Sequence, residues 1–310
     1  MMDEFSHFHS IENSYREECI TRFRTLHPDY LDATRFVVQE KVDGANISFH
    51  FYPRQPWRVA SRNGYLTAER KQSFFEVGSI LGKHERMCAQ IQDHVNQNGH
   101  TFILYGELFG ANINKRIKYG EKRIIFFDIK LNGQYLPHQP FSKTCKKLGI
   151  TPVVPLFAEN LTFTEALAFD SNMNSALTAQ PEICEGVVIK PQTMTKDATL
   201  YFCLKKVNAS FRELTEPQAV VHSDRIEQLR QIYAACINEN RVISLVSKCG
   251  PPRKQDLPRY ESMLKGDAKK DFIKDHAAEW KLLTKVQRRA VFRVPCQQHL
   301  FTKYFDNATV

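Results

Sequence analysis

The 310-residue sequence has no apolar run long enough to form a membrane-spanning helix. Such a helix needs roughly 18 or more consecutive apolar residues. The opening residues, MMDEFSHFHSIENSY, are acidic and lack the cationic and apolar blocks of a signal peptide. None of the eight cysteines forms a CxxC pair, which argues against zinc ribbons and disulfide frameworks. We therefore expect no membrane association and a cytoplasmic location, which would be the host cytoplasm for a viral protein.

The chain also lacks internal repeats and low-complexity tracts. Its composition, 42% hydrophobic and 25% charged, is typical of a globular protein with one large domain or two ordinary ones. The formal net charge is +9. A cationic surplus of this size favours a polyanionic partner such as nucleic acid.

The first two thirds of the chain mix helical and strand patterns. Ser10 is a candidate N-cap for a helix over residues 10–26, and helical periodicity returns over 70–97 and 164–169. Apolar β-rich runs predict strands over residues 36–52, 57–61, 101–109, 123–130, 185–190 and 199–207. The order lacks regular βαβ repeats, so the pattern predicts an α+β fold.

Beyond residue 215 the strand pattern disappears. Residues 222–248 and 267–290 predict helices, separated by a proline-rich loop over 249–258. Residues 216–310 contain 17 Lys and Arg against 11 Asp and Glu. We therefore predict two domains, 1–215 and 216–310, the second small, basic and helical. Its candidate phosphate contacts are Arg225, Arg230, Arg241, Lys269, Lys270, Arg288 and Arg289, although charged residues on helices are usually solvated.

The segment EKVDGAN contains Lys41, Asp43 and Gly44 at the end of a β-rich apolar run. In a strand, Lys41 and Asp43 would point to the same face. Gly44 would leave room for a close approach to the backbone. Taken alone, this KxDG pattern is equally consistent with an edge strand that carries a Lys–Asp salt bridge.

Further charged residues follow at the edges of other β runs. These are Arg62 in ASRNG, Glu107 in YGELFG, Asp128 in IIFFDIK, Glu185 and Lys190 in EGVVIKP, and Lys205 and Lys206 in YFCLKKVN. One such residue is unremarkable in any fold. Several of them together predict a shared polar cleft lined by strand ends.

The ordered set KxDG, SRxG, YGELFG, FFDI, EGVVIK and LKK resembles the covalent nucleotidyltransferase superfamily, and most closely the RNA ligase 2 family. The resemblance covers residues 5–214. It implies an ATP-grasp-like ligase domain of antiparallel sheets with flanking helices, followed by a small all-helical domain. It also implies an ATP-dependent RNA ligase that seals 3′-OH/5′-phosphate RNA ends, or nicks in duplex RNA, through a lysyl–AMP intermediate and AMP–RNA.

The same resemblance implies roles for individual residues. Lys41 would be the nucleophile that carries AMP. Its reference pKa of about 10.4 must fall before the neutral amine can attack, and a bound metal, Lys190 and Lys205 would lower it. The catalytic residues that the resemblance implies are Lys41, Asp43, Lys190 and Lys205. The implied ATP-binding residues are Glu40, Asn46, Arg62, Glu107, Phe127, Lys190 and Lys205. The implied ligands of Mg²⁺ or Mn²⁺ are Asp43, Glu107 and Glu185.

The last motif departs from the family pattern. The family usually has Lys-x-Lys, but here Lys205 is followed by Lys206 and Val207. Because strand side chains alternate, we expect Lys206 to face away from Lys205. This leaves the role of Lys206 open.

Three alternatives remain beside a monomeric ligase acting on nicked duplex RNA. A DNA ligase or a capping guanylyltransferase usually has an OB-fold after the last motif, and the helical tail here disfavours both. A relative that binds nucleic acid without catalysis is the third, which Val207 keeps open.

Overall fold

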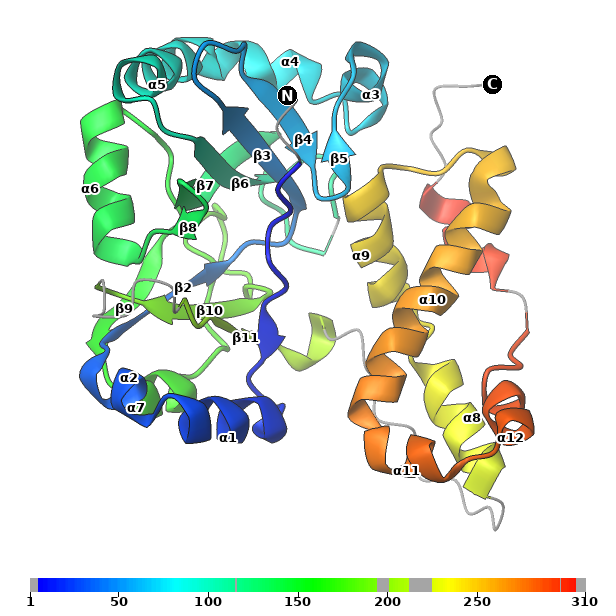
Figure 1. The fold of residues 1–310 in the computed structure, drawn as a ribbon. Coiled ribbons are helices and arrows are strands. Elements are labelled where there is room, and N and C mark those ends of the chain that lie inside the picture. The colour runs from blue at the N-terminus through cyan, green and yellow to red at the C-terminus, as the bar shows by residue number, and fades with distance from the viewer. Residues whose placement is uncertain (1–4, 115, 194–200, 212–224, 296, 305–310) are drawn as a thin grey trace. The chain divides into compact units, whose positions relative to one another are not determined.

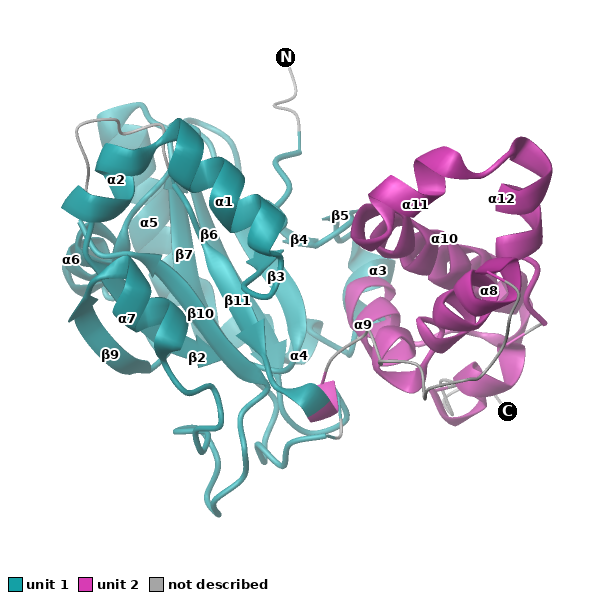
Figure 2. Cartoon of the chain, turned by 90° about the horizontal axis from the view of Figure 1, so that it is seen from below, with its two compact units in different colours: residues 1–209 teal, residues 210–310 magenta. Residues whose placement is uncertain are grey.

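The computed structural model describes residues 5–114, 116–193, 201–211, 225–295 and 297–304. The chain divides into two compact units, unit 1 (residues 1–209) and unit 2 (residues 210–310), coloured separately in Figure 2. The predicted boundary between residues 215 and 216 lies outside the described residues.

Unit 1 contains a five-stranded sheet, here called the first sheet, in the order β1–β11–β10–β2–β9 (Figure 1). β1 runs parallel to β11, and the other neighbours are antiparallel. The apolar side chains of β2, β10 and β11 pack on one face against helices α1, α2 and α7. The bounds are β1 (Glu12–Asn13), β2 (Phe36–Lys41), β9 (Leu156–Leu161), β10 (Gly186–Pro191), β11 (Leu204–Val207), α1 (Glu17–Leu26), α2 (Pro28–Ala33) and α7 (Phe163–Ala168).

The second sheet of unit 1 has six antiparallel strands in the order β5–β4–β3–β6–β7–β8. Phe49, Leu104 and Phe126 are fully buried on one of its faces, and α5 contacts β3. The elements are β3 (Ala45–Phe51), β4 (Arg58–Ser61), β5 (Gly64–Tyr65), β6 (Phe102–Phe109), β7 (Arg123–Leu131), β8 (Gln134–Tyr135), α3 (Ala68–Ser73), α4 (Gly78–Leu81), α5 (Glu85–Asn98) and α6 (His138–Leu148).

The secondary-structure elements of unit 2 are all helices within its described residues. An aromatic cluster of Tyr233, Phe272, Trp280 and Phe292 joins its longest helix, α10, to α8, α11 and the end of α12. Its elements are α8 (Arg225–Ala235), α9 (Glu239–Cys249), η3 (Lys254–Asp256), α10 (Leu257–Asp275), α11 (Ala277–Leu282), α12 (Lys285–Val291) and η4 (Gln298–Tyr304). The described helices of the chain include none long and apolar enough to cross a bilayer.

These elements confirm the predicted α+β fold with antiparallel sheets, flanking helices and a helical tail. Several predicted bounds were wrong. The helix predicted from Ser10 begins at Glu17, because residues 12 and 13 pair with β11 instead. The helices predicted over 70–97, 222–248 and 267–290 are each broken into shorter helices. Helix α10 begins at Leu257, inside the loop predicted over 249–258.

The largest correction concerns residues 36–52, which the sequence presents as one strand. They form two strands, β2 and β3, and these belong to different sheets. Residues 42–44 cross between the sheets, so Asp43 and Gly44 of the KxDG segment lie in a connection, while Lys41 ends β2. A Cβ on Gly44 would lie 2.4 Å from the carbonyl oxygen of Leu108. The predicted close approach at Gly44 is therefore present.

Candidate active site

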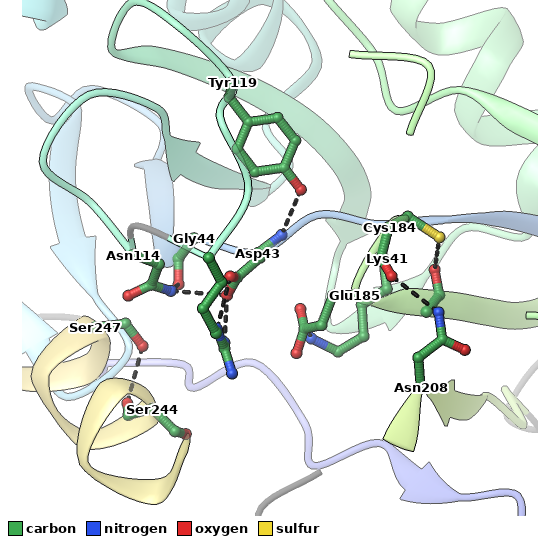
Figure 3. Close-up of polar contacts among 12 residues, drawn as sticks. Lys41, Asp43, Gly44, Asn114, Tyr119, Cys184, Glu185, Asn208, Ser244 and Ser247 are labelled. Atoms are coloured by element: carbon green, nitrogen blue, oxygen red, sulfur yellow. Dashed lines mark hydrogen bonds and ion pairs between the residues drawn. The ribbon is translucent and has the colours of Figure 1, made fainter. Parts of the chain in front are cut away.

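Lys41 is the last residue of β2 and forms an ion pair with Glu185, at 2.5 Å between Nζ and Oε2 (Figure 3). Lys41 lies opposite Gly186, which begins β10. Gly186 has a φ of +154°, and a Cβ there would lie 2.1 Å from the carbonyl oxygen of Lys206. Only glycine fits this position, and it allows β10 to lie directly between β2 and β11.

The strand register places three lysines on one face of the first sheet. Lys41 lies opposite Gly186, Lys205 lies opposite Val188, and Lys190 follows two residues later on β10. Directly opposed residues share a face, and residues two apart on a strand share it too. Lys41, Lys190 and Lys205 therefore project to the same side, as the sequence predicted for a shared cleft.

The second sheet meets this lysine-bearing face through Asp128. The Nζ of Lys190 lies 3.1 Å from Oδ1 of Asp128 and donates to the carbonyl oxygen of Phe127 at 2.6 Å. Lys190 has no exposed surface. The paired strands β3 and β6 bring Asn46 opposite Glu107, and the same register places Glu107 on the face that carries Asp128. The two sheets thus enclose a polar site between them.

The charges around Lys41 are dominated by carboxylates. Burial lowers the pKa of Lys41, but the charges of Glu185, Glu107 and Asp43 outweigh burial and hold the pKa above its usual value. The expected lowering by neighbouring cations is therefore absent from this arrangement. For Lys190, the reason that the expected lowering of the Lys41 pKa is absent is that Asp128 neutralises the charge of Lys190.

Asp43 is held by a loop that sequence analysis did not single out. Arg116 donates to both carboxylate oxygens, Asn114 donates to Oδ1 at 2.9 Å, and the Tyr119 hydroxyl accepts from the Asp43 amide at 3.1 Å (Figure 3). Asp43 therefore points to the β6–β7 loop and does not share a strand face with Lys41. The only sequence signal was the run of cations, KRIK, that follows the YGELFG motif.

Glu107 differs from the other two carboxylates because it forms no ion pair within the described residues. Burial is the main cause that raises its pKa to about 8; the charge of Lys41 opposes this rise, and the charges of Glu185 and Asp43 add to it. Burial also raises the pKa of Glu185, against the effect of Lys41. Lys41 and Arg116 thus pair with Glu185 and Asp43, and Glu107 lies close to this group without an ion pair among the described residues.

The three carboxylates Asp43, Glu107 and Glu185 bear on whether the site fits a divalent metal ion. The described part of the chain contains no group of three His, Cys, Asp or Glu that could bind an ion directly. Mg²⁺ prefers oxygen ligands and commonly keeps several of its waters. Asp43, Glu107 and Glu185 thus fit a hydrated ion held through its water molecules.

Phe127 occupies a β-bulge in β7. The register of β7 against β6 shifts between Gly106, which pairs with Phe126, and Tyr105, which pairs with Asp128. Phe127 is the extra residue, and bulges commonly redirect a side chain. The Phe8 ring meets the Phe127 ring edge-on, with centroids 5.2 Å apart.

Phe8 belongs to an N-terminal segment, residues 5–13, that crosses from the second sheet to the first (Figure 1). Ser6 accepts a hydrogen bond from Lys130 at 2.9 Å on the second sheet. At the other end, Asn13 pairs with Lys205 on the first sheet. The segment therefore connects the surroundings of Phe127 to those of Lys205.

Two residues lie on the opposite face of the first sheet. The Glu40 carboxylate accepts from the Ser175 hydroxyl at 2.5 Å and from the Ala176 amide at 3.0 Å. The structure therefore does not bring this carboxylate to Lys41. Lys206 donates to the carbonyl oxygens of Leu167 and Phe169, which confirms that it faces away from Lys205.

Arg62 follows β4 at the edge of the second sheet. The positive charge of Arg62 makes a small contribution that lowers the pKa of two groups of the site, Glu107 and His9. The backbone oxygen of Arg62 lies 3.0 Å from Nδ1 of His7. Arg62 is thus on the side of the site lined by Glu107.

Comparisons with known proteins found two matching family models and several similar solved structures. A family model described as "RNA ligase" matches residues 34–207, and one described as "T4 RNA ligase 2 C-terminal" matches residues 220–294. Solved structures of Naegleria gruberi RNA ligase are similar to this chain. The structure with PPi has a TM-score of 0.46 and 20% identity, covering 68% of this chain and 59% of that one. A mutant with AMP and Mn has a TM-score of 0.47 and 19% identity, covering 67% and 57%. The chain thus spans less than two thirds of the length of these structures.

Proposed function

Because the chain belongs to the RNA ligase family, we propose that it is an ATP-dependent RNA ligase that seals 3′-OH/5′-phosphate nicks in duplex RNA. The observation that carries the proposal is the placement of Lys41 beside Glu185 and Glu107, on the face that also carries Lys205. We assign adenylylation to residues 1–215 and nucleic-acid binding to residues 216–310, acting as a monomer.

In the first step, the neutral Nζ of Lys41 attacks the α-phosphorus of ATP. A P–N bond forms, the bond to the bridging oxygen breaks, and pyrophosphate leaves. Lys41 must first lose a proton, and the Glu185 carboxylate at 2.5 Å is the nearest acceptor among the described residues. General bases act from this hydrogen-bonding distance.

The second and third steps transfer AMP and then displace it. An oxygen of the RNA 5′-phosphate attacks the AMP phosphorus, and the P–N bond breaks to regenerate Lys41. The 3′-OH then attacks the activated 5′-phosphate, which forms the phosphodiester and releases AMP. Lys205 on the same face supplies positive charge for the phosphates.

The remaining residues bind and orient. Phe127, redirected by its bulge, supplies a ring for stacking on adenine, while Asn46, Arg62 and Glu107 line the side of the ribose and phosphates. Asp43, Glu107 and Glu185 would hold hydrated Mg²⁺ or Mn²⁺. When bound, such an ion stabilises negative charge on the phosphates and favours the neutral form of a nearby amine.

The test is covalent labelling of purified protein with α-labelled ATP or GTP in the presence of Mg²⁺. We expect label on the denatured protein from ATP alone, and none on Lys41→Ala or Lys41→Arg. The arginine variant retains a cation opposite Glu185 but removes the nucleophile. Labelled protein should then seal a nicked RNA duplex.

Other outcomes decide between the alternatives. Label from GTP would place the protein among capping enzymes, and sealing of DNA but not RNA nicks would make it a DNA ligase. Protein isolated with AMP already attached would take up label only after pretreatment with pyrophosphate. Absence of label after that pretreatment would refute the ligase proposal.

A further inference from the structure

Three of the seven cations expected to bind nucleic acid in unit 2 are paired with acidic side chains of the unit. Arg225 pairs with Glu279, and Arg230 pairs with Glu227 at 2.6 Å. Arg241 has no exposed surface and is bound by two aspartates. These three arginines therefore bind acidic side chains of unit 2 rather than a phosphate.

The segment over residues 280–304 has a different charge pattern. It contains six Lys and Arg and no Asp or Glu. Within it, four side chains are exposed and have no acidic partner among the described residues: Lys281, Lys285, Arg289 and Arg293. They lie on α11, on α12 and just beyond its end, and they are spaced four residues apart in the sequence.

Two exposed apolar side chains accompany these cations. Leu282 is 84% exposed and Val286 is 76% exposed, and they flank the turn between α11 and α12. Single exposed apolar residues are common on surfaces, but two this exposed beside an acid-free cationic segment are consistent with an interaction surface. We call Lys281, Leu282, Lys285, Val286, Arg289 and Arg293 the α11–α12 surface.

The backbone beneath the α11–α12 surface is well anchored. Arg288 points inward and donates to the carbonyl oxygens of Trp280 and Lys281, which closes the turn. Trp280 and Phe292 pack together with ring centroids 4.8 Å apart. Thr284 forms a capping box with Gln287 at the start of α12. A fixed backbone lowers the entropy lost when surface side chains bind a partner.

We propose that the α11–α12 surface is where unit 2 binds the duplex RNA substrate, with its cations on backbone phosphates and Leu282 and Val286 against the ribose faces. The inference rests on the proposed function and names the binding surface for that substrate. A polyanion is favoured over an apolar or acidic protein partner because the cations outnumber the apolar side chains and are unpaired. Phosphate contacts of this kind give affinity without sequence preference.

The experiment compares two matched triple variants. The first is Lys285→Ala/Arg289→Ala/Arg293→Ala. The control is Arg253→Ala/Lys254→Ala/Arg259→Ala, which removes the same residue types from exposed positions just before α10 and in its first turn. The two sets lie near opposite ends of α10, a helix of 19 residues. That length corresponds to roughly 28 Å.

Binding to a nicked RNA duplex is measured as a function of salt concentration. We expect the first triple to weaken binding by roughly 10- to 100-fold and to reduce the slope of log K against log salt by about 3. We expect the control triple to change the slope by less than about 1. Leu282→Ser/Val286→Ser should weaken binding several-fold without changing the slope, because it removes no charge.

Equal effects of the two triples would overturn the proposal, as would an unchanged affinity in the first. Loss of binding to phosphatidylserine vesicles with intact RNA binding would instead identify a membrane surface. Lysyl–AMP formation is measured in parallel and should be the same in all variants. A wild type that binds RNA through this surface without taking up AMP would refute the ligase function alone.

Discussion

Arg116 binds Asp43 through two parallel hydrogen bonds, one from Nε at 2.9 Å and one from Nη2 at 2.5 Å. Asp43 is 2% exposed. The β6–β7 loop thus holds the carboxylate of the KxDG segment by the bidentate geometry that arginine forms best. Any ligand that uses Asp43 must therefore compete with Arg116 or share the carboxylate with it.

The first prediction concerns the stability of this pair. Arg116→Ala would leave the buried Asp43 carboxylate without its cation, which we expect to lower the free energy of unfolding by about 3 kcal/mol. Adding Asp43→Asn should recover part of that loss, because the asparagine carries no charge. Urea denaturation of the two single variants and the double variant measures the coupling. Strictly additive losses would show that the two residues do not depend on each other.

The second prediction concerns the pH dependence of Glu107. Burial raises the pKa of its carboxyl from the usual 4.5 to about 8, so the folded state keeps a proton that the unfolded chain releases. Its contribution to stability is therefore full below about pH 4.5 and is lost as the pH rises to about 8. Glu107→Gln cannot titrate and should lack this loss.

The measurement is urea unfolding of wild type and Glu107→Gln between pH 5 and pH 8, with chelator present. The stability of the wild type relative to the variant should fall steadily across that range. Parallel curves would mean that Glu107 is already ionised at pH 5 in the folded state.

The third prediction separates the two adjacent lysines of β11. Lys206 donates to carbonyl oxygens near the end of α7, so Lys206→Ala should cost about 1 kcal/mol of stability and leave lysyl–AMP formation unchanged. Lys205→Ala should lower lysyl–AMP formation, because Lys205 lies on the face of Lys41. Thermal unfolding and labelling with α-labelled ATP check both effects. Loss of label from Lys206→Ala at unchanged stability would contradict the assignment of faces.

The fourth prediction restores the family pattern at residue 207. Val207 and Lys41 both lie opposite Gly186, on either side of it, and share a face. Val207→Lys would add a fourth lysine to that face, directly across Gly186 from Lys41, and favour the neutral amine of Lys41. We expect faster lysyl–AMP formation near neutral pH, measured by single-turnover labelling. Val207→Leu is the control, and an equal acceleration there would exclude a charge effect.

Strand alternation accounts for much of what the sequence predicted correctly. Alternation correctly predicted that Lys205 and Lys206 point in opposite directions. It also predicted that the polar residues at the strand ends share one site. The same rule, applied to Glu40 and Lys41, would have placed the Glu40 carboxylate on the face away from the nucleophile. The β-bulge at Phe127 and the binding of Asp43 by Arg116 depend on neighbouring strands and loops, so no local pattern predicts them.

The split of residues 36–52 between two sheets also has no clear local signal. The run is β-rich on both sides of residues 42–44, and Gly44 alone does not distinguish a bulge from a crossing. The crossing is fixed by partners distant in sequence, Gly186 opposite Lys41 and Leu108 opposite Ala45. Such pairings appear only in the folded structure.

The N-terminal segment has a practical consequence for expressing parts of this protein. The match to the RNA ligase model begins at residue 34, and a fragment cut there would lose β1 and Phe8. Removing β1 would expose the edge of β11, and an unprotected strand edge promotes aggregation. Removing Phe8 would uncover the apolar surface of Tyr105 and Phe127. A recombinant adenylylation domain that remains in solution should therefore begin no later than residue 5.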